Sequence, residues 1–125
     1  MDVGAGTRDA RAALGRAGED AALEVYLRRG FRLLARNWRC ALGELDLVVR
    51  RGRLLVFCEV KTRSGNAFGG GYEAVTRSKR RTLRRLAEAF VAETTLRPAA
   101  TRFDVASVQL ELGRIPEVEI YQDAF

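Results

Sequence analysis

The chain has 125 residues, of which 47% are hydrophobic and 30% are charged, and it carries a formal net charge of +6. This length and this balance are typical of one globular domain with one core. No apolar run approaches the roughly 20 residues that span a bilayer, and the first residues lack the apolar core of a signal peptide. We therefore expect a cytoplasmic protein that makes no membrane contact.

The sequence contains no histidine and only two cysteines, Cys40 and Cys58. The absence of histidine excludes the familiar Ser-His-Asp and Cys-His sites, and two cysteines alone cannot form a usual structural zinc site. Any metal would be held by oxygen, which favours magnesium, manganese or calcium. We expect two free thiols and no organic cofactor.

Residues 1–8 are predicted to be disordered, and a single domain is predicted to fill residues 9–125. The domain should begin with a helix over residues 9–29, because small and apolar residues recur there at intervals of three and four. Gly30 is a suitable stop signal for this helix. The predicted buried stripe of the helix consists of Leu14, Ala17, Gly18, Ala21 and Val25.

Strand patterns dominate the rest of the chain, with one further helix between them. Three strands are predicted over residues 31–39, 42–50 and 53–62. A glycine-rich loop at 64–73 should lead into a helix over 73–93 whose buried stripe includes Leu83, Leu86 and Phe90. Two last strands are predicted over residues 101–112 and 117–125. The order αβββαββ predicts an α/β fold with a mixed sheet flanked by helices.

The segment GELDLVVRRGRLLVFCEVKTR, at residues 43–63, is typical of a hairpin, yet charged residues interrupt both of its strands. Side chains alternate along a strand, so Glu59 and Lys61 should share one face, and a hairpin would place Asp46 roughly opposite Glu59. Strands lie about 4.8 Å apart, so the two carboxylates could hold one divalent cation between them. The residues predicted to face the other way are Leu45, Leu47, Val49, Cys58 and Val60.

A plainer interpretation of the same residues is a surface salt bridge between Lys61 and either Glu59 or Asp46 at a strand end. Such pairs are common and contribute little stability. The residue types and their spacing leave both interpretations open. Asp104, which alternates with Phe103 and Val105, is predicted to be structural, paired with Arg102 or Lys79.

The whole chain resembles the YraN family of small bacterial proteins, within the restriction-endonuclease-like PD-(D/E)xK nuclease superfamily, and is similar there to the archaeal Holliday-junction resolvases. The resemblance covers roughly residues 14–125. Leu45 stands where the superfamily's name has proline. The residues that carry the resemblance are GED at 18–20, Asn37, GELDLV at 43–48, FCEVKTR at 57–63, FGG at 68–70, Ala74-Val75, Lys79, RFDV at 102–105 and Ala124-Phe125.

The resemblance implies a restriction-endonuclease-like single domain with a bound Mg²⁺ or Mn²⁺. Asp46 and Glu59 would be metal ligands, together with the backbone carbonyl of Val60. Lys61 would orient or help to deprotonate the attacking water. Glu19 matches a position from which similar resolvases bring a further acidic residue to the metal. An ordinary surface role for Glu19 remains open, as does a ligand role for Glu44, which should face the same way as Asp46.

The segment TRSKRRTLRR, at residues 76–85, places basic side chains on the faces of the predicted helix that lie away from its apolar stripe. These side chains could follow a phosphate backbone without reading sequence, or could be a solvated helix face. Lys79 lies at the edge of the apolar stripe and should point inward, towards the site. The predicted nucleic-acid contacts are Lys79, Arg63, Arg77, Arg80, Arg81 and Arg84.

These features favour a metal-dependent DNA endonuclease that acts on branched or structured DNA in the bacterial cytoplasm. A nucleic-acid-binding module that keeps the nuclease fold without catalysis is the main alternative, and a scaffold for an acidic protein partner is a third. A homodimer is expected, because resolvases cut two strands symmetrically and twofold dimers are the commonest oligomers.

Overall fold

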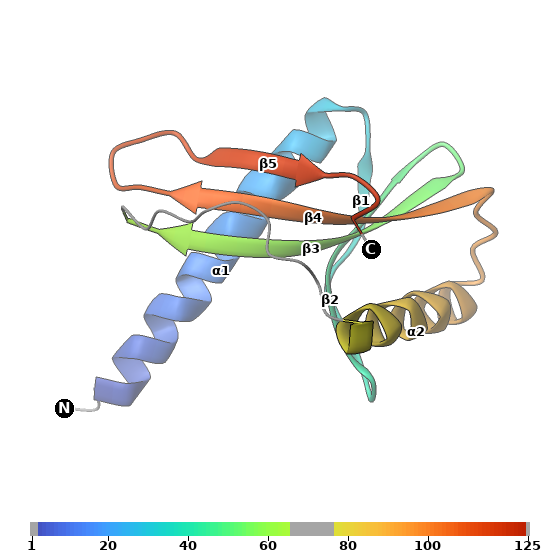
Figure 1. Ribbon diagram of the computed structural model, residues 1–125, viewed down its shortest axis with the longest axis horizontal. Coiled ribbons are helices and arrows are strands. Elements are labelled where there is room, and N and C mark those ends of the chain that lie inside the picture. Colours follow the sequence, from blue (N-terminus) through green and yellow to red (C-terminus); the bar gives the residue numbers. More distant parts are fainter. Residues whose placement is uncertain (1–2, 66–76, 125) are drawn as a thin grey trace.

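The computed structural model describes residues 3–65 and 77–124, with side chains from residue 9 onward (Figure 1). The order αβββαββ is confirmed. Most of the loop predicted at 64–73 lies outside the described ranges, as do residues 73–76 of the predicted second helix. Within those ranges, neither helix is long and apolar enough to cross a membrane. The elements are α1 (Val3–Arg28), β1 (Arg32–Cys40), β2 (Gly43–Arg51), β3 (Leu54–Ser64), α2 (Arg77–Thr94), β4 (Ala100–Leu110) and β5 (Glu117–Tyr121).

Helix α1 begins at Val3, well before its predicted start at Asp9, and it ends as predicted. Glycines early in the chain do not stop it, since an interior glycine costs only about 1 kcal/mol of helix stability. Gly30 adopts a φ of 87°, and the N–H of Phe31 donates to the carbonyl of Tyr26 at 3.0 Å. This is a Schellman cap, in which a left-handed glycine satisfies the last carbonyls of the helix.

The five strands form one mixed sheet in the order β1-β2-β3-β4-β5. The pair β3–β4 is parallel and the other three pairs are antiparallel. A parallel pair needs a crossover, and the chain segment that contains α2 provides it. In Figure 1, α1 runs behind β3, β4 and β5, whereas α2 lies below the sheet at its other side.

Each helix covers its own apolar face of the sheet. Helix α2 contributes Leu83, Leu86, Ala87 and Phe90 to a core with Val48, Phe57 and Val105, so its predicted stripe is confirmed. Helix α1 packs on the other face through Ala22 and Tyr26, against residues that include Leu47, Val49, Val56 and Cys58.

The predicted stripe of α1 is correct at Gly18 but wrong in its overall direction. Among residues 9–28 the buried positions are Gly18, Ala22 and Tyr26, whereas Ala17 is exposed and Val25 is only half-buried. Two contacts set this direction: Gly18 meets β3 closely, and the Tyr26 hydroxyl donates to Asp104 at 2.7 Å. Periodicity alone could not predict either contact, because both partners lie far along the chain.

Both cysteines are free thiols, as predicted. Cys58 is buried, and this burial raises the pKa of its thiol well above the ordinary value. The neutral side chain acts as a small apolar group in the core beneath α1.

Candidate metal centre at a fork in the sheet

The sheet opens between its second and third strands. The ladder between β2 and β3 stops at the pair Leu47–Cys58. Beyond this pair β2 continues beside β1, and β3 continues beside β4 as far as Ser64. We call this opening the fork. Asp46 and Glu59 are the next residues of the two strands, so the fork brings both carboxylates to one place.

The fork also explains one wrong prediction about the faces of β2. Alternation predicts that Leu45 lies with Leu47 and Val49, but it packs in the core beneath α2. Simple alternation holds while β2 is paired on both sides, and it fails where β2 leaves β3 and follows β1 alone.

Asp46 bridges the fork by a hydrogen bond. Its Oδ2 accepts the backbone N–H of Val60 at 2.8 Å. Burial raises the pKa of Asp46 to about 6, against the opposing effect of the Val60 hydrogen bond. Repulsion from Glu59, Glu19 and Glu44 adds to the rise. The negative charges of these carboxylates therefore raise one another's cost at the fork, which a bound cation would reduce.

Glu59 has one oxygen bound by lysines and one oxygen without a partner among the described residues. Its Oε1 lies 3.9 Å from Lys61 Nζ and forms an ion pair with Lys79. Its Oε2 is buried and accepts no hydrogen bond from any described residue. A buried carboxylate oxygen without a partner is costly, so Oε2 is suited to a ligand that is not part of the protein.

Lys79 reaches the fork from α2, although its side chain remains 43% exposed. Partial burial is the largest single effect and lowers the pKa of Lys79, but the hydrogen bond to Glu59 and the negative charges of Glu59 and Asp46 together outweigh it and raise the pKa above the ordinary value. Lys79 is thus a fixed positive charge beside the two carboxylates.

A cavity of about 180 Å³ lies at the fork, on the face that α2 covers. The cavity lies between the acidic residues of β2 and β3 and the first turns of α2. Glu44 lies at its edge, half-buried, and accepts a hydrogen bond from exposed Arg39 at 3.2 Å. The residues that line the cavity are Glu44, Leu45, Asp46, Phe57, Cys58, Glu59, Lys79, Leu83 and Phe103.

Glu19 approaches the fork from α1, and two residues of β1 hold it there. Arg36 Nε and Asn37 Nδ2 each donate to Glu19 Oε1 at 3.2 Å. Arg36 also donates to Asp20 at 2.6 Å and to the carbonyl of Arg16 at 2.9 Å, so it ties three positions of α1 to β1. Glu19 is only 12% exposed, unlike an ordinary surface glutamate.

Sequence reasoning did not assign a role to Arg36 or Asn37. Asn37 adopts a φ of 54°, a left-handed conformation that asparagine tolerates better than most residues. An asparagine inside an otherwise apolar and basic strand was the available signal. Arg36 offered none, since arginines are frequent throughout this chain.

Gly18 allows α1 to approach the fork. A Cβ at this position would lie 1.9 Å from Thr62 Oγ1 and 2.9 Å from Thr62 Cβ, so a side chain fits only if α1 or Thr62 shifts. We expect Gly18→Ala to lower the free energy of unfolding by about 2 kcal/mol through overpacking. Urea unfolding measures this loss. Gly15→Ala is the control, because nothing lies within 4 Å of that position; equal stability of the two variants would contradict the close approach.

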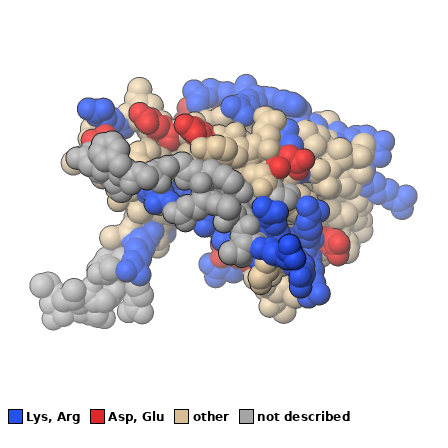
Figure 2. Space-filling view, in the orientation of Figure 1, with Lys and Arg blue, Asp and Glu red and all other residues tan. Residues whose placement is uncertain are grey.

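The predicted nucleic-acid residues lie on α2 and on β3. Residues Arg77, Lys79, Arg80, Arg81 and Arg84 are exposed on α2, as is Arg85. They contribute to the basic cluster at the lower right of Figure 2, near the start of α2 in Figure 1. Arg63 is half-buried on β3, beyond Glu59 and Lys61.

The donor atoms at the fork fit a hard divalent cation. Asp46 and Glu59 supply carboxylate oxygens, and Glu59 Oε2 accepts no hydrogen bond from the described part of the chain. Among the described residues, no three acidic or cysteine side chains lie close enough to hold a metal by themselves. Magnesium requires only one or two carboxylates and takes its other ligands from water, carbonyls or phosphate, so this donor set is sufficient for it.

Comparison with known proteins identifies the family. The model of the uncharacterised protein family UPF0102 matches residues 18–108. The chain belongs to this family. The matched UPF0102 region contains every residue placed at the fork, from Glu19 on α1 to Lys79 on α2.

Individual UPF0102 proteins are similar over most of their length. The chain is 50% identical to a UPF0102 protein of Parafrankia sp. over 112 residues, which is 90% of this chain and 95% of the relative. It is 47% identical to one of Mycolicibacterium vanbaalenii, over 88% of this chain and 91% of the relative. A UPF0102 protein of Frankia alni is 52% identical over 79% of this chain and 82% of its own length.

Proposed function

We propose that this UPF0102 protein is a metal-dependent endonuclease that hydrolyses phosphodiester bonds in DNA. The observation that carries the proposal is the fork, where Asp46 and Glu59 meet beside Lys61 and Lys79. A partly buried carboxylate with a raised pKa beside other charged groups is a candidate for a functional role. The partnerless oxygen of Glu59 supports a role in holding a cation.

Asp46, Glu59 and the carbonyl of Val60 would hold Mg²⁺ or Mn²⁺. The chemistry that such an ion supplies is activation of water and neutralisation of phosphoryl charge. Lys61 lies on the edge of the fork, where its ammonium group can orient the water or stabilise charge on the phosphate. Lys79 offers a second ammonium group for a phosphate oxygen. Glu19, held by Arg36 and Asn37, adds negative charge on the α1 side of the fork.

The exposed basic residues of α2 support DNA as the substrate. They begin beside the fork and present several guanidinium groups to solvent, as contacts to a phosphate backbone require. The resemblance to Holliday-junction resolvases extends the proposal to branched or structured DNA, cut by a homodimer in the bacterial cytoplasm.

The test is a cleavage assay on labelled duplex, single-strand, flap and four-way-junction DNA. The wild type is compared with an Asp46→Ala, Glu59→Ala double variant in magnesium, manganese and EDTA. We expect cutting only by the wild type and only with a metal. Glu24→Gln, an exposed residue on α1, is the control and should cut normally. Cleavage that survives in the double variant would remove the fork as the site.

A module that binds nucleic acid without cutting it is the second candidate. Two observations favour it: no described group of three acidic or cysteine side chains can hold a metal alone, and Lys79 already pairs with Glu59. This interpretation predicts salt-sensitive binding, no cleavage with any divalent ion, and unchanged binding in the double variant. The same assay, with a binding measurement added, separates the two candidates.

A further inference from the structure

The end of the sheet opposite the fork carries a concentration of arginines that the proposed function does not use. They come from four places in the chain: the end of α1, the start of β1, the β2–β3 turn, and the connection from α2 to β4. We call this surface the arginine end. It consists of Arg29, Arg32, Arg50, Arg51, Arg53 and Arg97.

Hydrogen bonds and strand pairing bring these segments together at one end of the sheet. Arg51 Nη1 donates to the carbonyl of Arg29 at 3.0 Å, and Arg53 Nη2 donates to the carbonyl of Arg97 at 3.1 Å. Arg32 pairs with Arg50 in the register of β1 and β2. Figure 2 shows basic side chains along the upper and right edges of the molecule, where α1 ends and the β2–β3 turn lies in Figure 1.

No carboxylate of the described residues neutralises these arginines. Within residues 9–65 and 77–124, none of the six forms an ion pair. Arg50 donates to the carbonyl of Gly52 at 2.7 Å, so its hydrogen bond, like those of Arg51 and Arg53, goes to the backbone. A guanidinium group has five N–H donors and binds phosphate in a bidentate manner, so these groups keep donors for an anion.

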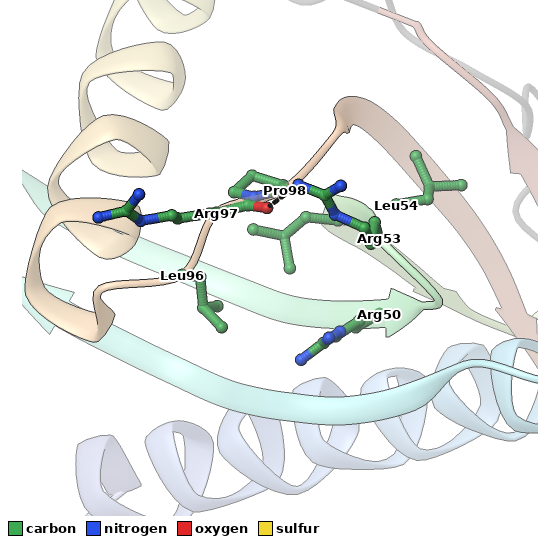
Figure 3. A pocket seen from close by; sticks show the side chains of 7 residues that line it. Arg50, Arg53, Leu54, Leu96, Arg97 and Pro98 are labelled. Carbon is green, nitrogen blue, oxygen red and sulfur yellow. Dashed lines mark hydrogen bonds between the residues drawn. The ribbon is translucent and has the colours of Figure 1, made fainter.

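A cavity of about 160 Å³ lies within the arginine end. Arg50 and Arg53 border it from the two sides of the β2–β3 turn (Figure 3). Leu96 and Pro98 form an apolar wall from the α2–β4 connection, and Arg97 turns its carbonyl towards Arg53 while its guanidinium extends away. No acidic residue of the described chain lines this cavity. It has the charge for one phosphate group and an apolar wall for the adjoining sugar.

We infer that the arginine end is a second DNA-binding surface, which takes the phosphate backbone outside the segment held at the fork. The inference rests on the proposed function, since it assigns the same DNA to both surfaces. Nucleic acid fits better than an acidic protein, because protein interface cores are poor in charged residues whereas protein–DNA interfaces are strongly positive.

The spacing of the two surfaces suits one DNA molecule. Arg50 follows Asp46 by four residues on β2, which at about 3.3 Å per residue is about 13 Å. A duplex rises 3.4 Å per base pair, so the arginine end begins about four base pairs from the fork. Binding there would extend the protein–DNA interface beyond the cutting position.

The experiment measures binding to a 30-base-pair duplex in EDTA across a series of salt concentrations. The test variant carries Arg50→Gln, Arg53→Gln and Arg97→Gln. The control variant carries Arg11→Gln, Arg16→Gln and Arg114→Gln, which remove the same number of charges from exposed positions elsewhere. Thermal unfolding checks that both variants fold. We expect the plot of log affinity against log salt to become less steep by up to about 2.7 in the test variant, at about 0.9 for each of three phosphates that the protein no longer neutralises.

The outcomes separate this inference from the proposed function. If log affinity depends less steeply on log salt in the test variant than in the control variant, the result supports DNA binding by the arginine end. Equal slopes in the two variants, with metal-dependent cutting by the wild type, overturn the arginine end alone. No DNA binding by the wild type overturns both proposals. Loss of binding to poly-glutamate by the test variant, with its DNA slope unchanged, overturns the inference in favour of an acidic protein partner.

Discussion

Asp46→Asn should make the protein more stable at neutral pH while lowering metal-dependent cleavage about 1,000-fold. The loss of cleavage follows because an amide binds a divalent cation poorly, and a cation supplies several kcal/mol of stabilisation to the transition state. The gain in stability follows because an ionised Asp46 is held among other carboxylates in a partly buried place. The amide oxygen can still accept the Val60 N–H, so the bridge across the fork is kept.

The sign of the pH dependence follows from the raised pKa. Between the ordinary value of 3.8 and the folded value of about 6, the folded state binds more protons than the unfolded chain. Wild-type stability therefore falls as pH rises through this window, by up to about 3 kcal/mol, and does not return above it. Asp46→Asn lacks this titration, so its advantage should be small at pH 3.5 and full at pH 7.5.

Urea unfolding in EDTA at these two pH values measures the effect. Asp9→Asn, an exposed carboxylate on α1, is the control and should show no comparable gain. Added magnesium should stabilise the wild type and not Asp46→Asn, because a ligand that binds only the folded state raises its stability. If Asp46→Asn were less stable than the wild type at pH 7.5, ionised Asp46 would not destabilise the folded state.

Asp104→Ala should lower the free energy of unfolding by about 3–5 kcal/mol, the cost of breaking a buried ion pair. Asp104 is fully buried and accepts both Nε and Nη2 of Arg102 at 2.9 Å. It also accepts the Tyr26 hydroxyl at 2.7 Å and the N–H of Asp123 at 3.0 Å. Its removal leaves the half-buried Arg102 and the buried Tyr26 hydroxyl without their acceptor.

Asp20→Ala is the matched control, since Asp20 also pairs with an arginine but is 68% exposed. Its loss should cost no more than about 1 kcal/mol. Urea unfolding of both variants provides the comparison, and a similar small loss for each would show that burial adds little at Asp104. Unlike Asp46, Asp104 has hydrogen-bond donors on both of its oxygens, so its removal should destabilise the fold.

The sequence predicted well wherever a local pattern decides the structure. Alternation and a short turn were enough to place Asp46 opposite Glu59 at the level of strands, and the apolar stripe of α2 was correct. The structural role of Asp104 was predicted as well, and of its two predicted partners, Arg102 and Lys79, the structure pairs it with Arg102. These features depend on residues that are close in the chain, so the periodicity of apolar residues and the spacing of charged residues predict them directly.

Long-range interactions account for what the sequence could not predict. The face of α1 depends on Thr62 and Asp104, and the position of Glu19 depends on Arg36 and Asn37. Leu45 leaves its expected face because the β2–β3 ladder ends at Leu47, and the residues of β2 alone do not predict this end. In each case the deciding partner belongs to another element.

The fork has a consequence for the behaviour of the protein in concentrated solution. From Glu59 to Ser64, β3 has a ladder with β4 but none with any other described strand, so among the described residues this edge of β3 carries no strand partner. Open edges recruit strands from other chains and begin aggregation, and inward-pointing charges prevent this. Glu59, Lys61 and Arg63 supply such charges along this edge. The side chains assigned to chemistry thereby also protect the protein from self-association into β-aggregates.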